Sequence, residues 1–350
     1  HSIIVDPYVW ILGRFITGFS IISIFVVVES WLNDRATNRT RGKVLSIYMI
    51  ITFIGIGLGT LLLNFNNPKN YEPFILVSLL LSIALVPILL TKRKPPTFKK
   101  TTRIKIKELY KISPLATFSM FCVGFIHPAI FTMGAVYGAL MNFSVLEISL
   151  YLFLITVSGA IFQWPIGYLS DRYDRRIILI ITALLGSILT VLCFFSVSVS
   201  QDFLNLSGDW KTILQHINNH RLLFYIFISL YAGMSLPLFS LNLAYVNDFL
   251  PKEKFVSAGA GMQIIFGISA MSAPFVCSFF MKNFGPNGIF IFLFIFQTLI
   301  GIFGIYRMTR RSSEENPDNT FTPMPRNITP LGMELDPDAG VDLTNKENKN

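Results

Sequence analysis

Residues 171–176 of the sequence hold two aspartates and three arginines, within the stretch GYLSDRYDRR at 167–176. Only 14% of the chain is charged, and the flanking segments Tyr151–Ile166 and Ile177–Ser200 are mostly apolar. Carboxylates and guanidinium groups at this spacing can form charge-assisted hydrogen bonds with one another or with a neighbouring helix. The turn therefore predicts a polar connection between elements of an otherwise apolar protein.

Two further ionisable residues stand inside long apolar stretches, Arg14 in GRFITGFS and Glu29 in FVVVESW. An ion inside a membrane is costly even on the mildest scale, so each needs a partner or a task. Arg14 could face a central cavity and bind an anionic group or tune a proton-carrying acid, or it could extend to the nearby headgroups. Glu29 could carry a coupling proton, since burial favours the neutral carboxyl group, or it could pair with arginines of a preceding segment.

His127, in GFIHPAI, is the only histidine within a long apolar stretch. An imidazole titrates near about pH 6.5, which makes His127 a natural proton relay. Pro128 beside it cannot donate a backbone N–H and lets a helix bend, at a place where transporters often bind ligands. The alternative is a histidine that only hydrogen-bonds to a neighbouring helix. Gln163 and Trp164 are expected to serve packing or the membrane interface.

The elements that carry these residues are long apolar runs. The chain has 350 residues, is 52% hydrophobic and has a mean hydropathy of +0.57. A helix needs roughly 20 apolar residues to cross a bilayer core of about 30 Å. Nine stretches meet this length: Pro7–Val28, Val44–Leu63, Pro73–Thr91, Ser113–Met141, Ile148–Leu169, Ile177–Ser200, Leu222–Val246, Val256–Met281 and Asn287–Arg307. They are apolar on every face and predict an all-α membrane protein.

The distribution of positive charge indicates which side faces the cytoplasm. The net charge is +9, composed of −5 on residues 312–350 and +14 on residues 1–311. One set of alternate loops holds twenty-one lysines and arginines, nine of them between Lys92 and Lys111. The other set holds four: Lys69, Lys211, Arg221 and Lys282. This bias orients the first set of loops to the cytoplasm, and no nucleic-acid partner is expected.

Residues that would indicate an enzyme are missing from the sequence. Cys122, Cys193 and Cys277 each fall inside a predicted span, as small buried hydrophobic residues do. The chain has no phosphate-binding loop, no cluster with metal-ligand spacing and no pairing of a nucleophile with a base. We therefore expect no enzyme activity, no direct use of ATP, no cofactor and no metal.

A weak internal repeat suggests how the spans are organised. Asn33 and Asp34 align with Asn247 and Asp248 when the segments around them are superimposed. Such repeats are a signature of secondary transporters. If the last three spans repeat the first three, the block Ser113–Ser200 needs a partner of about 90 residues ahead of His1, and we expect twelve spans of which nine are present.

The chain is accordingly predicted to have four parts. Residues 1–91 form the last three spans of an N-terminal bundle, and residues 92–112 form a basic cytoplasmic linker on anionic headgroups. Residues 113–311 form a six-span C-terminal bundle. Residues 312–350, rich in proline, asparagine and acids, are predicted to be a disordered acidic cytoplasmic tail.

The charged turn resembles the loop motif of the major facilitator superfamily, which recurs between the second and third spans of each half. The matching residues are Gly167, Leu169, Asp171, Arg172, Arg175 and Arg176, whereas Asp174 replaces the usual glycine. The resemblance in architecture covers His1 to about Arg311. Arg14 and Gly18 partly match the family's fourth-span motif, in which Thr17 replaces the usual glutamine.

The resemblance implies a cytoplasmic gate. Asp171 is expected to cap the helix that starts near Val44, and Arg172 or Arg175 to meet Asp248, so that the two halves are held together on that side. The gating residues are thus Gly167, Asp171, Arg172, Asp174, Arg175, Arg176 and Asp248, and the candidates for substrate binding or proton coupling are Arg14, Glu29 and His127.

The function that follows is a secondary active transporter of a small solute in the plasma (inner) membrane. Proton coupling, a monomer and alternating access between two bundles are expected. Export is favoured over uptake because the chain resembles drug exporters, although Gly55–Thr60 lacks their glycine–proline pair. Two alternatives stay open: a membrane sensor or adaptor without transport activity, whose tail binds a partner, and a non-functional truncated remnant.

Overall fold

The computed structural model of the chain describes residues 6–37, 40–65, 70–90, 104–203, 219–310 and 320–339. Every regular element in these residues is a helix. Among these described residues, eight helices are long and apolar enough to cross a membrane, and a ninth apolar helix, Glu72–Pro87, is shorter. The prediction of an all-α membrane protein is confirmed, with the count of nine spans holding only approximately in the part that the structure describes.

Each predicted apolar run falls on a helix. The first three are α1 (Pro7–Arg35), α2 (Arg41–Leu61, extended by the 3₁₀ turn η1, Leu62–Asn64) and α3 (Glu72–Leu89). The fourth run comprises α5 (Pro114–Pro128), the π-helical turn η2 (Ala129–Met133) and α6 (Gly134–Leu140). The others are α7 (Val145–Arg172), α8 (Arg175–Phe203), α10 (Asn219–Ser235) with α11 (Leu238–Asn247), α12 (Phe255–Phe284, after the turn η3, Lys252–Lys254) and α13 (Gly288–Met308).

Local sequence signals determine where two of the helices begin. The Asp6 carboxylate accepts hydrogen bonds of 2.9 and 3.1 Å from the backbone N–H groups two and three residues on, and Pro7 occupies the first helical position. Ser144 and Glu147 form a reciprocal capping box at the start of α7, with hydrogen bonds of 3.2 and 2.7 Å. Both motifs satisfy backbone donors at a helix end, where water would otherwise be needed.

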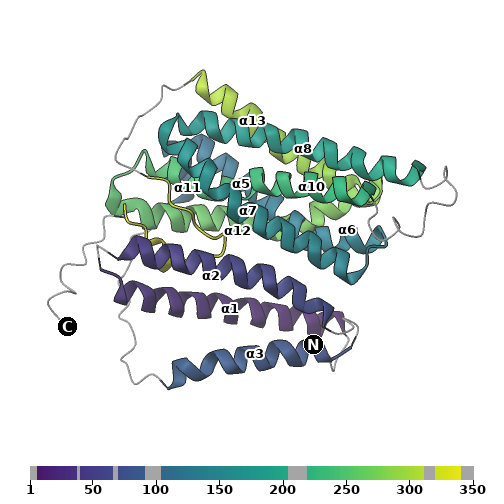
Figure 1. Cartoon of the computed structure of the whole chain (residues 1–350). Coiled ribbons are helices and arrows are strands. Elements are labelled where there is room, and N and C mark those ends of the chain that lie inside the picture. The colour runs from purple at the N-terminus through teal and green to yellow at the C-terminus, as the bar shows by residue number, and fades with distance from the viewer. Residues whose placement is uncertain are drawn as a thin grey trace.

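Helices α5–α8 and α10–α13 pack into one bundle, α1 and α2 lie along one side of it, and α3 lies farther out (Figure 1). Glycines allow the closest crossings in this bundle. A Cβ atom at Gly301 on α13 would stand 2.4 Å from Leu184 on α8, and one at Gly124 on α5 would stand 2.0 Å from the Ser269 hydroxyl on α12. Small residues thus bring these spans together where lipid supplies no hydrophobic driving force.

Two spans of the bundle are irregular near their middle. The fourth run changes from α to π geometry directly after Pro128, where the sequence predicts a bend. The seventh run is broken between α10 and α11 at Pro237. Proline cannot donate a backbone N–H, and π turns inside helices often mark functional sites. The π turn begins two residues after His127, and the break between α10 and α11 faces the His127 side chain.

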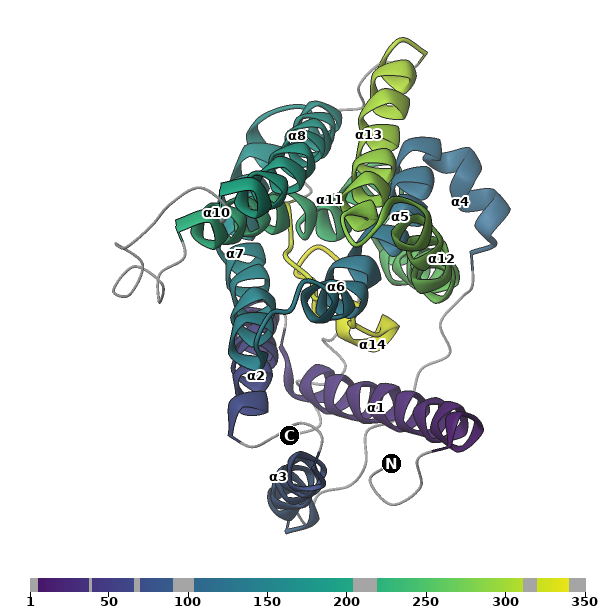
Figure 2. The same ribbon diagram turned by 90° about the vertical axis from the view of Figure 1, so that its right-hand side faces the viewer.

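The linker and the tail are more ordered than their composition predicts. Linker residues 106–112 form the helix α4 (Ile106–Ile112), whose Leu109 is fully buried against Gly261 of α12. Residues 320–339, which include the short helix α14 (Pro330–Met333), pack between α2 and the main bundle (Figure 2). The predicted disorder is therefore wrong for residues 320–339, because the apolar residues spaced along this segment pack between α2 and the main bundle. The remainder of the tail lies outside the described residues.

Candidate functional site

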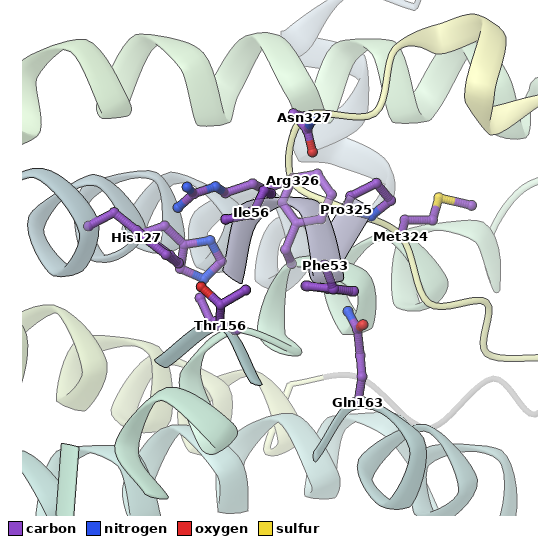
Figure 3. Close-up of a pocket in the computed structure, with 12 residues that line it drawn as sticks. Phe53, Ile56, His127, Thr156, Gln163, Met324, Pro325, Arg326 and Asn327 are labelled. Carbon is purple, nitrogen blue, oxygen red and sulfur yellow. The ribbon is translucent and has the colours of Figure 1, made fainter. Parts of the chain in front are cut away.

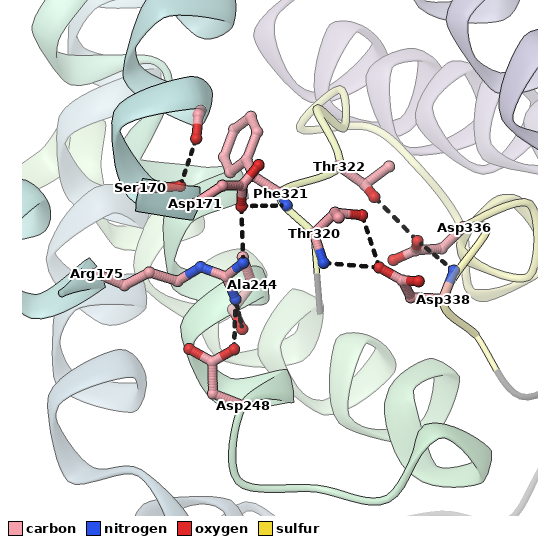
Figure 4. Close-up of polar contacts among 11 residues, drawn as sticks. Ser170, Asp171, Arg175, Ala244, Asp248, Thr320, Phe321, Thr322, Asp336 and Asp338 are labelled. Carbon is pink, nitrogen blue, oxygen red and sulfur yellow. Dashed lines mark hydrogen bonds and ion pairs between the residues drawn. The ribbon is translucent and has the colours of Figure 1, made fainter. Parts of the chain in front are cut away.

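The Arg175 guanidinium joins the ends of two helices at the charged turn (Figure 4). Its Nη2 donates to Asp171 Oδ1 at 2.9 Å, and its Nη1 donates to Asp248 Oδ1 and, at 3.2 Å, to the Ala244 carbonyl. Arg175 is only 8% exposed, so these charge-assisted bonds form away from bulk water. The structure thus contains the predicted pairing of Arg175 with Asp248, which connects α7 and α8 to α11.

Asp174, the residue that departs from the family motif, has a local role. Its carboxylate accepts hydrogen bonds from the backbone N–H of Arg176 at 2.9 Å and from Arg176 Nε at 3.0 Å. A carboxylate at the N-terminus of α8 satisfies a free backbone donor and interacts favourably with the helix dipole. Arg172 instead places its guanidinium 4.2 Å from the centroid of the Tyr168 ring. No hydrogen bond or ion pair between Arg172 and Asp248 is found among the described residues.

Asp171 does not cap α2, contrary to the prediction. It accepts a 2.7 Å hydrogen bond from the backbone N–H of Phe321, and no side chain caps the start of α2. The Phe321 ring lies over Gly167, where a Cβ atom would stand 2.2 Å from the ring. The physical reason is that the segment 320–339 lies between the charged turn and α2 and supplies the donor that Asp171 accepts.

The environment of Asp248 favours its neutral form. Burial raises the pKa of Asp248 to about 7, against the opposing effect of Arg175 and with a smaller contribution from the charges of Asp171 and Asp174. Asp248 stands just beyond the end of α11, on the side of the molecule that the loop charges assign to the cytoplasm. Burial and the Arg175 cation therefore act in opposite directions on the charge of Asp248.

Glu29 is fully buried near the end of α1 and accepts four hydrogen bonds. One comes from the Tyr48 hydroxyl of α2 at 2.6 Å. The others come from the segment 320–339: the backbone N–H groups of Thr329 and Gly332 at 2.9 and 3.1 Å, and the Thr329 hydroxyl. A carboxylate with several donors is stabilised without an arginine partner. These contacts test neither of the two roles predicted for Glu29, proton coupling or pairing with the arginines of a preceding segment.

A small cavity of about 30 Å³ lies between α2 and the main bundle (Figure 3). The helices contribute mostly apolar side chains and a few polar ones, and residues 324–327 complete the wall. The helical lining consists of Phe53, Ile56, His127, Phe131, Thr156, Gln163, Leu236 and Phe239. An apolar cavity with a few convergent polar groups is the usual form of a small-molecule site.

His127 lies on the wall of this cavity. Its Nε2 is 3.3 Å from the Ser235 carbonyl, at the break between α10 and α11, and among the described residues its Nδ1 has no hydrogen-bond partner. The guanidinium of Arg326 stacks 3.7 Å from the centroid of Phe131 and points into the cavity (Figure 3). The contact with Ser235 is the neighbouring-helix hydrogen bond that the sequence left open as an alternative to a proton relay.

Arg14 lies apart from these groups. Its side chain is exposed on α1, and it lines none of the cavities described. The structure therefore brings together Asp171, Arg175 and Asp248, places His127 at the cavity and leaves Arg14 outside both. No group of three or more histidine, cysteine or acidic side chains within the described residues could hold a metal ion.

Sequence reasoning missed several polar contacts of the site. Gln163, expected to serve packing, lines the cavity and donates to the Ser240 hydroxyl at 3.1 Å. Ser240 also donates to the Met324 carbonyl at 3.1 Å. A polar residue inside an apolar run was the available signal for Gln163 and Ser240. No pattern in the sequence pairs them with a segment about 80 residues away.

Comparison with known proteins agrees with this geometry. The family model of the Major Facilitator Superfamily matches residues 3–208, more than half of the chain. The chain belongs to the Major Facilitator Superfamily. Members are membrane transporters, so this is an integral, multi-pass membrane protein that acts on a small-molecule substrate and is not an enzyme. The resemblance that the loop motif indicated is confirmed.

Several relatives from this superfamily match most of the chain. The uncharacterised MFS-type transporter YcaD of Escherichia fergusonii is 23% identical over 289 residues, 81% of this chain and 68% of the relative. The uncharacterised MFS-type transporter YfkF of Bacillus subtilis is 25% identical over 293 residues, 82% of this chain and 69% of the relative. A third, from Yersinia enterocolitica, is 24% identical over 294 residues. No solved structure matches the chain.

Proposed function

We propose that this member of the superfamily is a secondary active transporter that moves a small solute by alternating access. The observation that carries the proposal is the cavity between α2 and the main bundle, to which both groups of helices contribute side chains. Its apolar and aromatic walls suit a small solute with an apolar body, and His127, Thr156 and Gln163 supply the polar contacts.

The charged turn is proposed to act as the gate on the cytoplasmic side. Arg175 connects Asp171 at the end of α7 with Asp248 at the end of α11, at the face where the basic loops gather. Opening that face requires these bonds to exchange for water. Protonation of Asp248 would weaken its attraction to Arg175, which offers a physical route from proton binding to opening.

Proton coupling is proposed through Glu29 and His127. Glu29 is a buried acid that accepts hydrogen bonds from Tyr48 of α2 and from the segment 320–339, and His127 is a titratable side chain on the cavity wall. We propose that the protein acts as a monomer in the plasma (inner) membrane. We also propose that it exports its solute, a direction supported only by the resemblance to drug exporters. Arg14 is proposed to extend to the outer headgroups, since its side chain is exposed.

Flux measurements in proteoliposomes test this function. The full chain is reconstituted with a pH-sensitive dye inside, and ethidium is the first of a panel of lipophilic compounds added outside. We expect a compound-dependent pH change that Glu29→Gln and His127→Ala reduce at least about tenfold, while the exposed control Trp164→Phe leaves it unchanged. Solute flux without a pH change would exclude proton coupling, and no flux for any compound would contradict transport.

A membrane sensor or adaptor is the second candidate, and one observation favours it. The segment 320–339 is packed onto the helices through buried residues, as expected for a tail whose release signals to a partner. This function predicts no solute flux in the same vesicles. It also predicts a cellular phenotype when residues 312–350 are deleted.

A further inference from the structure

The segment Thr320–Ala339 lies between two groups of helices, in the centre of the molecule as seen along the spans (Figure 2). Its apolar side chains are inserted rather than spread on a surface, and Ile328 and Leu335 are at most 1% exposed. The Met333 thioether contacts α12 at Gly259, where a Cβ atom would stand 2.1 Å from the sulfur. Burial of this extent stabilises a docked position by the hydrophobic effect.

One set of polar contacts holds the segment to α1 and α2. Glu29 accepts from Thr329 and Gly332, as described above. Asn33 Nδ2 donates to the Leu331 carbonyl at 2.7 Å, and Arg41 Nη1 donates to the Ala339 carbonyl at 2.8 Å. These bonds satisfy backbone groups of the segment that would otherwise be buried without partners.

A second set holds the same segment to the main bundle. Asp171 accepts from the backbone N–H of Phe321 at 2.7 Å (Figure 4). The Met324 N–H donates to the Ser240 hydroxyl at 3.0 Å, and Gln263 Nε2 donates to the Arg326 carbonyl at 2.9 Å. The segment thus bridges α1 and α2 on one side and α7, α11 and α12 on the other, and the relative motion of these helices would break one set of bonds.

The middle of the segment, residues 324–327, also borders the cavity. Residues 324–327 form part of its wall on the side of the charged turn, and Arg326 reaches toward His127 (Figure 3). A solute could not leave or enter through that side while these residues stay in place. Helix contacts on both sides and obstruction of the cavity therefore coincide in one segment.

We propose that Thr320–Ala339 is an autoinhibitory plug, which closes the cavity on the cytoplasmic side and must leave before that side opens. The inference rests on the proposed function for its physiological meaning, but the closure itself is testable without a solute. A carboxyl-terminal segment of net negative charge is also attracted to the face where the basic loops lie.

Arg326 makes the plug releasable. Burial lowers the pKa of Arg326 to about 10, and none of the described cavity-lining residues is acidic. The stacking on Phe131 offsets only part of the cost of removing a guanidinium from water. Because the desolvation of Arg326 opposes docking, the docked and released states stay close in free energy, as a switch requires.

Disulfide cross-linking tests the docked position in the full chain with Cys122, Cys193 and Cys277 replaced by alanine. The pair Gly259→Cys with Met333→Cys should cross-link readily, because the Met333 side chain contacts the Gly259 backbone. The control pair Gly267→Cys with Met333→Cys uses a glycine on the same helix that has nothing within 4 Å. Equal yields for the two pairs would overturn the docking.

Cytoplasmic access to the cavity tests the plug. Thr156→Cys, on the cavity wall, is labelled with a membrane-impermeant maleimide in inside-out vesicles, with Lys252→Cys on the exposed turn as the control for reagent access. Adding Ile328→Glu should expel the segment and raise the labelling rate at least about tenfold, whereas Ile328→Val should not. Arg326→Leu should lower the rate below that of the parent chain.

The outcomes separate the plug from the transport function. Faster labelling in Ile328→Glu supports the plug even if no compound gives flux, in which case the proposed transport fails alone. Equal labelling in Ile328→Glu and Ile328→Val overturns the plug whatever the flux. A chain that ends after Ser312 is the second variant, and it must also label faster than the parent chain if the plug exists.

Discussion

The ends of α1 and α11 carry related sequences but different partners. At α11, Asp248 is neutralised by Arg175 from the same group of helices. At α1, Glu29 and Asn33 hydrogen-bond to backbone, hydroxyl and carboxylate groups of the segment 320–339. The ion pair at α11 joins neighbouring helices of one bundle, whereas the hydrogen bonds at α1 join a helix to a separate segment. Departure of that segment would therefore break the bonds at α1 and leave the ion pair at α11 in place.

Removing Arg175 should have the largest effect. Arg175→Ala leaves the largely buried Asp248 without its cation, and breaking one partner of a buried pair costs about 3–5 kcal/mol. Thermal unfolding in detergent should show a marked loss of stability. Arg172→Ala is the matched control, because Arg172 is exposed and stacks on Tyr168. Equal losses of thermal stability for the two variants would mean that the ion pairs of Arg175 do not stabilise the fold.

The docked segment should respond to pH through Asp336. Burial raises the pKa of Asp336 to about 6, helped by Asp338 and opposed by hydrogen bonds from Asp338 and Thr322 and by the charge of Arg41. A carboxyl group whose pKa is higher when docked favours docking at low pH, and this contribution is lost as pH rises from about 4 through about 6.

The anisotropy of a fluorophore at Thr320→Cys measures this release. The rise in the pKa of Asp336 corresponds to up to about 3 kcal/mol of docking free energy, so the anisotropy should fall between about pH 4 and pH 6. Arg175 also faces this region. Asp336→Asn should remove the pH dependence, and an unchanged profile in that variant would exclude Asp336 as its source.

Neutralising the two acids sharpens the comparison between the helix ends. Glu29→Gln keeps one oxygen acceptor but loses the charge shared by its donors, so docking should weaken by about 1–3 kcal/mol. Asp248→Asn should leave docking almost unchanged, because no contact between Asp248 and the segment is found among the described residues. The yield of the Gly259–Met333 cross-link measures both. Equal yields would erase the distinction between the helix ends.

The smallest effect is expected from one hydroxyl group. Thr329→Val keeps the shape of the side chain and the backbone bond to Glu29 but removes the hydroxyl donor, which costs about 1 kcal/mol. The same cross-linking yield should fall slightly, while Thr322→Val, whose hydroxyl binds Asp336 instead, tests whether the effect is specific to Glu29. A larger loss for Thr322→Val would shift the main attachment toward Asp336.

The sequence by itself determined the class of protein, the spans and the family. Apolar runs of about twenty residues can satisfy their backbone groups in lipid only as helices, and prolines and capping residues act over a few neighbours. The pairing of Arg175 with Asp248 was also predictable, because a specific motif carried it. These features depend on local composition and spacing, which one chain displays directly.

Only the tertiary structure decided what fills the space between the helix groups. The composition of residues 312–350 predicts disorder, yet Ile328, Met333 and Leu335 are buried and Asp171 binds Phe321 rather than α2. Whether a polar, proline-rich segment docks depends on a complementary surface assembled from five helices that are distant in the sequence. That surface exists only once the chain has folded, because burial and hydrogen bonding are properties of the assembled neighbours and not of the segment.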